Sequence, residues 1–470
     1  MPATYRVRFS SSQPARFAHV PQPTATETES QLHGRTRRKS RGGCRECKRR
    51  RVKCDERFPI CVRCQRRGSV CLMDPKASTW QLELPGLTMQ RSPSNTALIG
   101  SHVDARLLRR WLDRTSQIMV LNPDTNPLSY PLLAALQPCP WLASVLQSIS
   151  AAHERNFSQS ASTACVVHRG HALREFSRQL SSPDPPLAAM LLGVFLLGVS
   201  SCWIDADPSQ YGGEHILGGR AIFDMLLARD ASKREPLDWL AISCWIYWDM
   251  ACSLCVDPAV QTPMDSPAVY SAIAAMKGDY HCMMGYSVQL YHLLGTLGRY
   301  CRGVISLGEK DLVLECLLEE QLLETKGPNP IPDNELAWLE EAYRLHGLIL
   351  LYRICGVQPY LLREWDDPDD HIHQLALQAV HLLSLIPIDS CYLTMQPIPL
   401  LTASAELWDE DVQERDDVTR RFKALYSANR TPVNVWALQM IRELWELRSI
   451  GIVVSWVDLM ISKNWCFTLG

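Results

Sequence analysis

Six cysteines share one short stretch of the chain, and their spacing repeats. They are Cys44, Cys47, Cys54, Cys61, Cys64 and Cys71. The pattern C-x2-C-x6-C therefore occurs twice in succession. Closely spaced thiolates favour zinc, and structural zinc sites are four-coordinate tetrahedra. Four cysteines could hold one ion and leave two thiols idle, or six could complete two tetrahedra if two of them bridge both ions. The second arrangement leaves no open position, so it predicts a structural rather than a catalytic metal site.

Positive charge accompanies these cysteines. The stretch "CRECKRRRVKC", from Cys44 to Cys54, contains six basic residues in eleven positions. Positions 35–67 hold 15 Lys or Arg and 3 acidic residues, whereas the rest of the chain holds 33 basic and 47 acidic residues. Nearby basic side chains favour the thiolate form of cysteine. A compact cationic stretch on an acidic chain also predicts a polyanionic partner, most commonly nucleic acid.

The cysteine pattern resembles the fungal Zn2Cys6 binuclear cluster family of transcription factors. The resemblance implies two Zn²⁺ ions per chain and a DNA-binding function. It implies bridging by Cys44 and Cys61, with Cys47 and Cys54 completing one zinc site and Cys64 and Cys71 the other. Asp55 and Pro59 also match the family's pattern between the two halves.

The first half of the repeat is the more basic one, so we expect it to face double-stranded DNA. Its candidate DNA-binding residues are Lys48, Arg49, Arg50, Arg51 and Lys53. Modules of this family place a helix in the major groove, where arginine can bond guanine O6 and N7 together. The resemblance implies base contacts by Arg50 and Arg51 within CGG-type triplets, although many members carry lysine at the second of these positions. The other basic residues would contact phosphate.

Other functions are compatible with the same residues. A zinc module that binds only protein is one alternative, and a cluster with an appended small-molecule sensor domain is another. The segment Arg35–Arg41 fits a nuclear import signal whether or not the cluster reads DNA, so we expect the nucleus. The sequence lacks P-loop, HExxH and GxSxG motifs, and we predict no enzymatic activity. Expected partners are DNA and transcription machinery or co-regulators. Binding as a monomer and binding as a homodimer, with a second copy of the chain, both stay open.

Composition and periodicity divide the chain into four parts. We expect a disordered tail at 1–33, the cluster module at 34–73, a Pro- and Gly-containing linker at 74–100 and a large all-α domain at 101–470. The last part resembles, weakly, the regulatory domain of fungal transcription factors. We predict ten or more helices there, including ones over 102–120, 332–354 and 431–448, with Asn434 as the cap of the last. The linker shows no sustained heptads, so it does not predict a coiled-coil dimer.

One apolar stretch, Leu187–Ile204, has 18 uncharged residues, the lower limit for a membrane span. A helix buried in a large core explains it without a membrane, and we predict no membrane partner. The first ten residues lack an apolar segment, so we expect no secretory signal and reduced thiols.

Three local patterns could also suggest chemistry. Cys252 and Cys255 form a CxxC pair, but their apolar neighbours favour buried thiols. The segment "DDPDDHIH" at 366–373 contains possible metal ligands, although a helix start enriched in Asp explains it better. The segment "ELWDEDVQERDD" at 406–417 mixes apolar and acidic residues, as activation segments do; a solvated helix end is the favoured interpretation.

Overall fold

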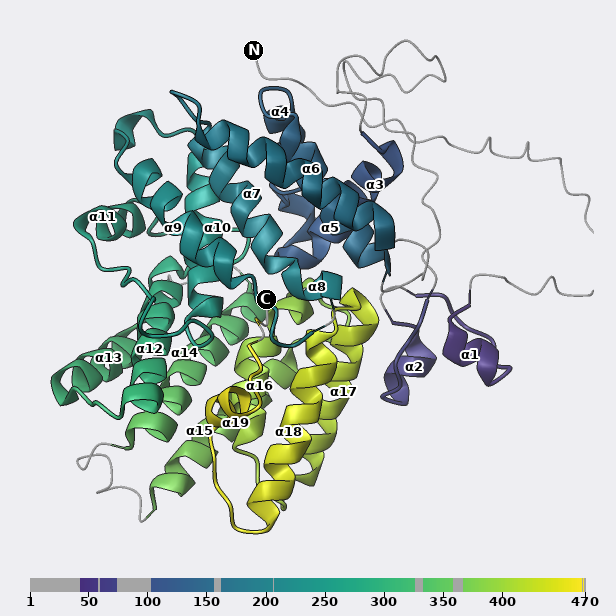
Figure 1. Cartoon of the computed structure of the whole chain (residues 1–470). Helices are drawn as coiled ribbons and strands as arrows, with labels where there is room; N and C mark the ends of the chain where they lie inside the picture. The colour runs from purple at the N-terminus through teal and green to yellow at the C-terminus, as the bar shows by residue number, and fades with distance from the viewer. Residues whose placement is uncertain are drawn as a thin grey trace, which may run out of the picture.

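The computed structural model describes residues 43–57, 60–73, 103–155, 162–205, 207–325, 333–357, 367–466 and 468. The predicted tail at 1–33, the segment Arg35–Arg41, Pro59 and the linker from residue 74 to 100 lie outside these ranges. The described residues are mainly α-helical and contain no strand, only an isolated bridge between His281 and Gly285. A cysteine-rich module precedes a large helical domain (Figure 1), which confirms the predicted fold class.

The cysteine module repeats in structure as it does in sequence. It contains helices α1 (Arg45–Arg49) and α2 (Val62–Arg66). A cysteine begins each helix, since the Sγ atoms of Cys44 and Cys61 accept hydrogen bonds from the backbone N–H three residues later, at 3.3 and 3.4 Å. Each helix then ends in a left-handed turn, with φ of 55° at Arg51 and 56° at Gly68. Only glycine adopts this conformation without cost, so the turn at Arg51 carries backbone strain.

The helical domain has two halves that follow one another along the chain (Figure 1). The first half comprises α3 (Ala105–Arg110), α4 (Leu133–Leu136), α5 (Trp141–Arg155), α6 (Ser162–Leu180), α7 (Leu187–Val199), α8 (Ser201–Asp205), α9 (Gly213–Leu227), α10 (Pro236–Cys252) and α11 (Pro267–Ala275). The second half comprises α12 (Val288–Leu307), α13 (Leu312–Glu324), α14 (Asn334–Cys355), α15 (Pro368–Leu385), α16 (Pro397–Ala405), α17 (Val412–Asn429), α18 (Val433–Ser449) and α19 (Trp456–Ser462). Helices α10 and α12 pack together and join the halves.

Helix α7 forms the centre of the first half. All of its residues are buried, and it packs against α9 and α10. Glycine allows this close approach, because a Cβ atom at Gly198 would lie 2.2 Å from the Trp248 ring. The apolar stretch at 187–204 therefore lies in the helical core, as predicted, but it is divided between α7, which ends at Val199, and α8, which begins at Ser201. Within the described part of the chain, no helix has the length and apolar character needed to cross a membrane.

One predicted helix changes type along its length. Residues 102–120 were expected to form one helix, but α3 ends at Arg110 and is followed by a π-helical turn over Trp111–Thr115 and a 3₁₀ turn over Ser116–Met119. Side chains compete for backbone acceptors here. The Ser116 hydroxyl donates to the Trp111 carbonyl at 2.9 Å, and the Gln117 amide donates to the Leu112 carbonyl at 2.7 Å. These bonds replace the regular helical pattern.

The two later helices were located correctly, with one error in a cap. Asp333 caps α14 by accepting from the Glu335 N–H at 2.9 Å. Helix α18 begins at Val433, so Asn434 lies in its first turn and is not its cap. The prediction failed because the Asn434 amide instead donates to Asn429 and Thr431 side-chain oxygens, at 3.0 and 2.7 Å, across the α17–α18 junction.

Candidate metal centre and nucleic-acid interface

The six sulfur atoms form two overlapping groups of four. Cys44, Cys47, Cys54 and Cys61 make one group, and Cys44, Cys61, Cys64 and Cys71 make the other. All sulfur atoms within a group lie within 4.8 Å of one another. Cys44 and Cys61 belong to both groups.

The sulfur spacing fits tetrahedral zinc. The Sγ atom of Cys44 lies 3.9 Å from that of Cys61 and 3.7 Å from that of Cys64, and the Cys47 and Cys61 sulfurs lie 3.7 Å apart. A tetrahedron with Zn–S bonds of about 2.3 Å has an edge of about 3.8 Å. Two tetrahedra that share the Cys44–Cys61 edge would use all six sulfurs and leave no position open for a substrate.

Burial makes three of these thiols less acidic than a free cysteine. Burial raises the pKa of Cys64 to about 12 and raises the pKa values of Cys47 and Cys71 well above the usual range. Burial thus favours the protonated form of these three thiols, and binding a dication must release their protons. Besides Cys44 and Cys61, two further sulfurs accept hydrogen bonds from backbone N–H groups: Glu56 donates to Cys54, and Cys61 donates to Cys71, both at 3.3 Å.

Asp55 joins the two halves of the module. Both of its carboxylate oxygens accept from the Val62 N–H, at 3.1 and 3.2 Å. This bond satisfies a donor in the first turn of α2 and fixes that helix relative to Cys54. The residue therefore has a structural role that its match to the family pattern did not specify.

The five candidate DNA-binding residues are exposed, but only two belong to a helix. Lys48 and Arg49 lie in α1, Arg50 caps its end, Arg51 occupies the left-handed turn, and Lys53 follows it. The expected reading surface is thus the end of α1 together with the following turn. We call positions 48–53 the basic segment.

Glu46 orients part of the basic segment. Its carboxylate accepts two hydrogen bonds from Arg49, both at 3.0 Å, and also pairs with Arg50. These bonds lower the pKa of Glu46, so it remains ionised in mildly acidic solution. Among the residues the structure describes, no carboxylate pairs with Lys48, Arg51 or Lys53. Their charge is available to an external anion.

The module packs on the helical domain beside α17 (Figure 1). The N–H of Cys71 donates to the Ser427 hydroxyl at 2.8 Å, and the Arg430 guanidinium donates to the Cys71 carbonyl at 2.9 Å. Arg57 also forms an ion pair with Asp389. No sequence pattern indicated these contacts, because the partners lie more than 300 positions apart.

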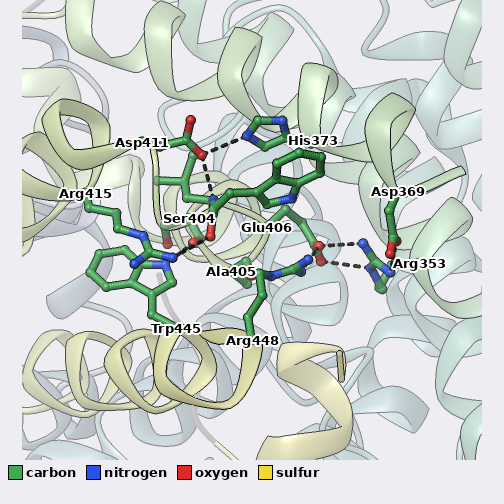
Figure 2. Close-up of polar contacts among 12 residues, drawn as sticks. Arg353, Asp369, His373, Ser404, Ala405, Glu406, Asp411, Arg415, Trp445 and Arg448 are labelled. Carbon is green, nitrogen blue, oxygen red and sulfur yellow. Dashed lines mark hydrogen bonds and ion pairs between the residues drawn. The ribbon is translucent and has the colours of Figure 1, made fainter. Parts of the chain in front are cut away.

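Two of the three local patterns behave as predicted. Cys252 and Cys255 are buried within the helical core. Asp367 caps α15 by accepting from the Asp369 N–H at 3.0 Å, so Asp367, Asp369 and Asp370 mark a helix start, while Asp366 lies outside the described residues. His373 is buried and bonds to Asp411 at 2.7 Å (Figure 2).

The third pattern, at 406–417, was only partly interpreted correctly. The segment does contain a helix end, since α17 begins at Val412. Glu406 and Leu407, however, are buried rather than exposed to solvent. The Glu406 carboxylate bonds to the guanidinium groups of Arg353 and Arg448, at 2.7 and 2.6 Å (Figure 2). Two cations from α14 and α18 make burial of this carboxylate possible, and no local sequence rule shows them.

Comparison with known families identifies both parts of the chain. Residues 42–80 match the fungal Zn(2)-Cys(6) binuclear cluster domain, and residues 106–470 match the fungal specific transcription factor domain. The second match covers most of the chain, which therefore belongs to this family of transcription factors. The family is non-enzymatic and its members bind DNA through a zinc cluster, so the predicted class is confirmed.

Two curated relatives are similar over short regions. The chain is 40% identical over 89 residues to the Zn(2)-C6 fungal-type transcription factor afumD of Aspergillus fumigatus, which is 17% of this chain and 23% of the relative. It is 37% identical over 91 residues to the lysine biosynthesis regulatory protein LYS14 of Saccharomyces cerevisiae, which is 18% of this chain and 12% of the relative. The match thus spans less than a quarter of either relative. No solved structure matches the chain.

Proposed function

We propose that this chain is a nuclear regulator of RNA polymerase II genes that reads CGG-type triplets in double-stranded DNA. The observation that carries the proposal is the exposed basic segment mounted directly on the six-sulfur cluster. Family membership supports DNA binding in general. The CGG triplet, the nuclear location and any contact with co-regulators or a second copy of the chain are proposals that go beyond family membership.

The proposed metal centre contains two Zn²⁺ ions. Cys44 and Cys61 would bridge them, since their sulfurs alone belong to both groups of four. Zinc would supply structural cross-links between the two halves, because the described part of the module, 43–57 and 60–73, buries few apolar side chains besides its cysteines. The domain limits, with the helical regulatory part at 101–470, belong to the same proposal.

The basic segment would divide its contacts between bases and phosphates. Arg50 and Arg51 stand at the exposed end of α1, where a guanidinium can bond the O6 and N7 atoms of guanine. Lys48, Arg49 and Lys53 would bind phosphate and set the register. Glu46 would limit the motion of Arg50 before DNA binds, since the two already pair.

A double substitution tests this assignment. Fluorescence anisotropy would compare a duplex containing a CGG triplet with one in which the triplet is scrambled. We expect the wild-type chain to prefer the first duplex, and the Arg50→Ala/Arg51→Ala variant to lose about 1–3 kcal/mol of that preference per lost base contact. The matched control removes two exposed arginines from α6, Arg174→Ala/Arg178→Ala, and should keep the preference. A wild-type chain with no preference would favour the protein-binding alternative.

A further inference from the structure

The module and the helical domain together form a basic groove. The groove has a volume of about 580 Å³. Its charged lining residues are Arg45, Glu46, Arg49, Arg50, Arg67 and Lys423. The first five belong to the cysteine module, whereas Lys423 comes from α17. One side chain of the helical domain therefore faces the same space as α1.

Three contacts bring α17 to this position. Ser427 and Arg430 hold both backbone groups of Cys71, as described above. The turn after α2 then approaches α17 at a glycine, because a Cβ at Gly68 would lie 3.6 Å from Cγ of Arg420. Lys423 lies between Arg420 and Ser427 in the sequence of α17. Its place in the groove follows from the way the module packs.

The charge of the groove is unbalanced. Among the described residues that line it, five are cationic and one, Glu46, is acidic, and Glu46 is already bonded to Arg49 and Arg50. Lys423 is half-buried, and no carboxylate in the described part of the chain lies within ion-pair distance of it. Holding several cations close together costs free energy unless an anion occupies the space. The groove continues directly from the basic segment through Arg49 and Arg50.

We propose that the helical domain is part of the DNA-binding surface, with Lys423 binding a backbone phosphate beside the bases that the basic segment reads. The inference rests on the proposed function for its ligand, duplex DNA. Lysine at a phosphate adds affinity without sequence preference. Because Cys71 ties the module to α17, the DNA backbone would cross α17 at a fixed distance from the triplet. The helical domain would then add to affinity directly, besides any regulatory role.

The salt dependence of binding measures this contact. The full-length, zinc-loaded chain would be titrated onto a random-sequence duplex at several salt concentrations. We expect Lys423→Ala to weaken binding about three- to fivefold, in line with an exposed ion pair. The slope of log affinity against log salt should become shallower by about 0.9, the value for one phosphate contact. Lys423→Arg should retain both the affinity and the slope.

Controls separate this inference from the proposed function. Lys277→Ala removes an exposed lysine from the second position after α11, and should change neither quantity. Helix α11 lies on the opposite side of the molecule from α1 in Figure 1. Lys423→Gln serves as a second variant that keeps a long side chain in place. Lys423 variants that match the wild type in affinity and slope would overturn the inference, even if CGG preference is present. A shallower slope without any CGG preference would support the groove and contradict the proposed triplet reading. A wild-type chain that binds no duplex would contradict both.

Discussion

Arg430 donates a hydrogen bond to the carbonyl oxygen of Cys71 at 2.9 Å, and only 3% of the Arg430 surface is exposed. Ser427, one turn earlier, accepts from the N–H of the same cysteine. A proposed zinc ligand is therefore held by the helical domain through both of its backbone polar groups. The cysteine module and the helical domain should consequently gain or lose stability together.

The first prediction concerns the hydrogen bond from the Cys71 N–H to Ser427. Ser427→Ala leaves the Cys71 N–H without its acceptor, and a buried unsatisfied donor costs about 1–2 kcal/mol. The free energy of unfolding, measured on the zinc-loaded chain with urea, should fall by that amount. Ser449→Ala is the matched control, since its hydroxyl bonds only to the Glu446 carbonyl in an exposed part of α18. Equal stabilities for the two variants would show that the hydrogen bond between Cys71 and Ser427 contributes nothing to the free energy of unfolding.

The second prediction concerns the shared sulfurs. Cys61→Ser removes a ligand from both groups of four and should abolish binding of both zinc ions. Cys54→Ser removes a ligand from one group only, so the group of Cys44, Cys61, Cys64 and Cys71 stays complete and should keep one ion. Native mass spectrometry would count the ions per chain. Identical metal contents for these two variants would contradict the bridging arrangement.

The third prediction separates stability from recognition at Arg51. Its φ of 55° is unfavourable for any residue with a Cβ atom, so Arg51→Gly should stabilise the chain by about 1 kcal/mol. The same change removes a charge from the basic segment and should weaken DNA binding. Thermal unfolding and anisotropy would reveal the opposite signs. Gly68→Arg gives the reciprocal control, because the equivalent turn with φ of 56° should become less stable by a similar amount.

The fourth prediction is a dependence of stability on pH. Burial lowers the pKa of His153 to about 3 and that of His346 to about 4. The unfolded chain therefore takes up these protons near pH 6.5, while the folded chain does not. The free energy of unfolding should fall as the pH drops from about 6.5 to 4, by up to about 1.4 kcal/mol per pH unit for each histidine.

Unfolding of His346→Gln at several pH values would isolate one of these groups. Its curve should be shallower than that of the wild type between pH 6.5 and 4. His381→Gln changes an exposed histidine and provides the control. A wild-type chain equally stable across this pH range would show that the buried histidines do not titrate on unfolding.

The cysteine module was largely predictable from the sequence, because its information is local. Six spaced cysteines and the basic residues from Lys48 to Lys53 lie within one short segment, and metal geometry restricts how it can fold. The α-helical class was equally accessible, since apolar periodicity and caps such as Asp333 depend on near neighbours. The π-helical turn after α3 and the role of Asn434 could not be predicted from periodicity. The Ser116 hydroxyl bonds to a backbone carbonyl in the first case, and the Asn434 amide bonds to the Asn429 side chain in the second.

Packing between distant parts of the chain could not be predicted. Nothing near Ser427 or Arg430 indicates that they bond to Cys71, and nothing near Lys423 indicates that it lines the same groove as Arg49. Glu406 shows the same limitation, since its burial depends on Arg353 and Arg448 from separate helices. Such contacts depend on the way in which helices pack, which periodicity alone does not determine.

Sequence reading by the basic segment is the central claim, and in vitro selection tests it most directly. The full-length, zinc-loaded chain would select from a pool of random duplex DNA at fixed, near-physiological salt, because phosphate contacts make affinity strongly salt-dependent. We predict enrichment of CGG-type triplets, singly for a monomer or as two triplets at fixed spacing for a dimer, and loss of this enrichment in Arg50→Ala/Arg51→Ala. A chain that binds zinc yet enriches no sequence would contradict the claim.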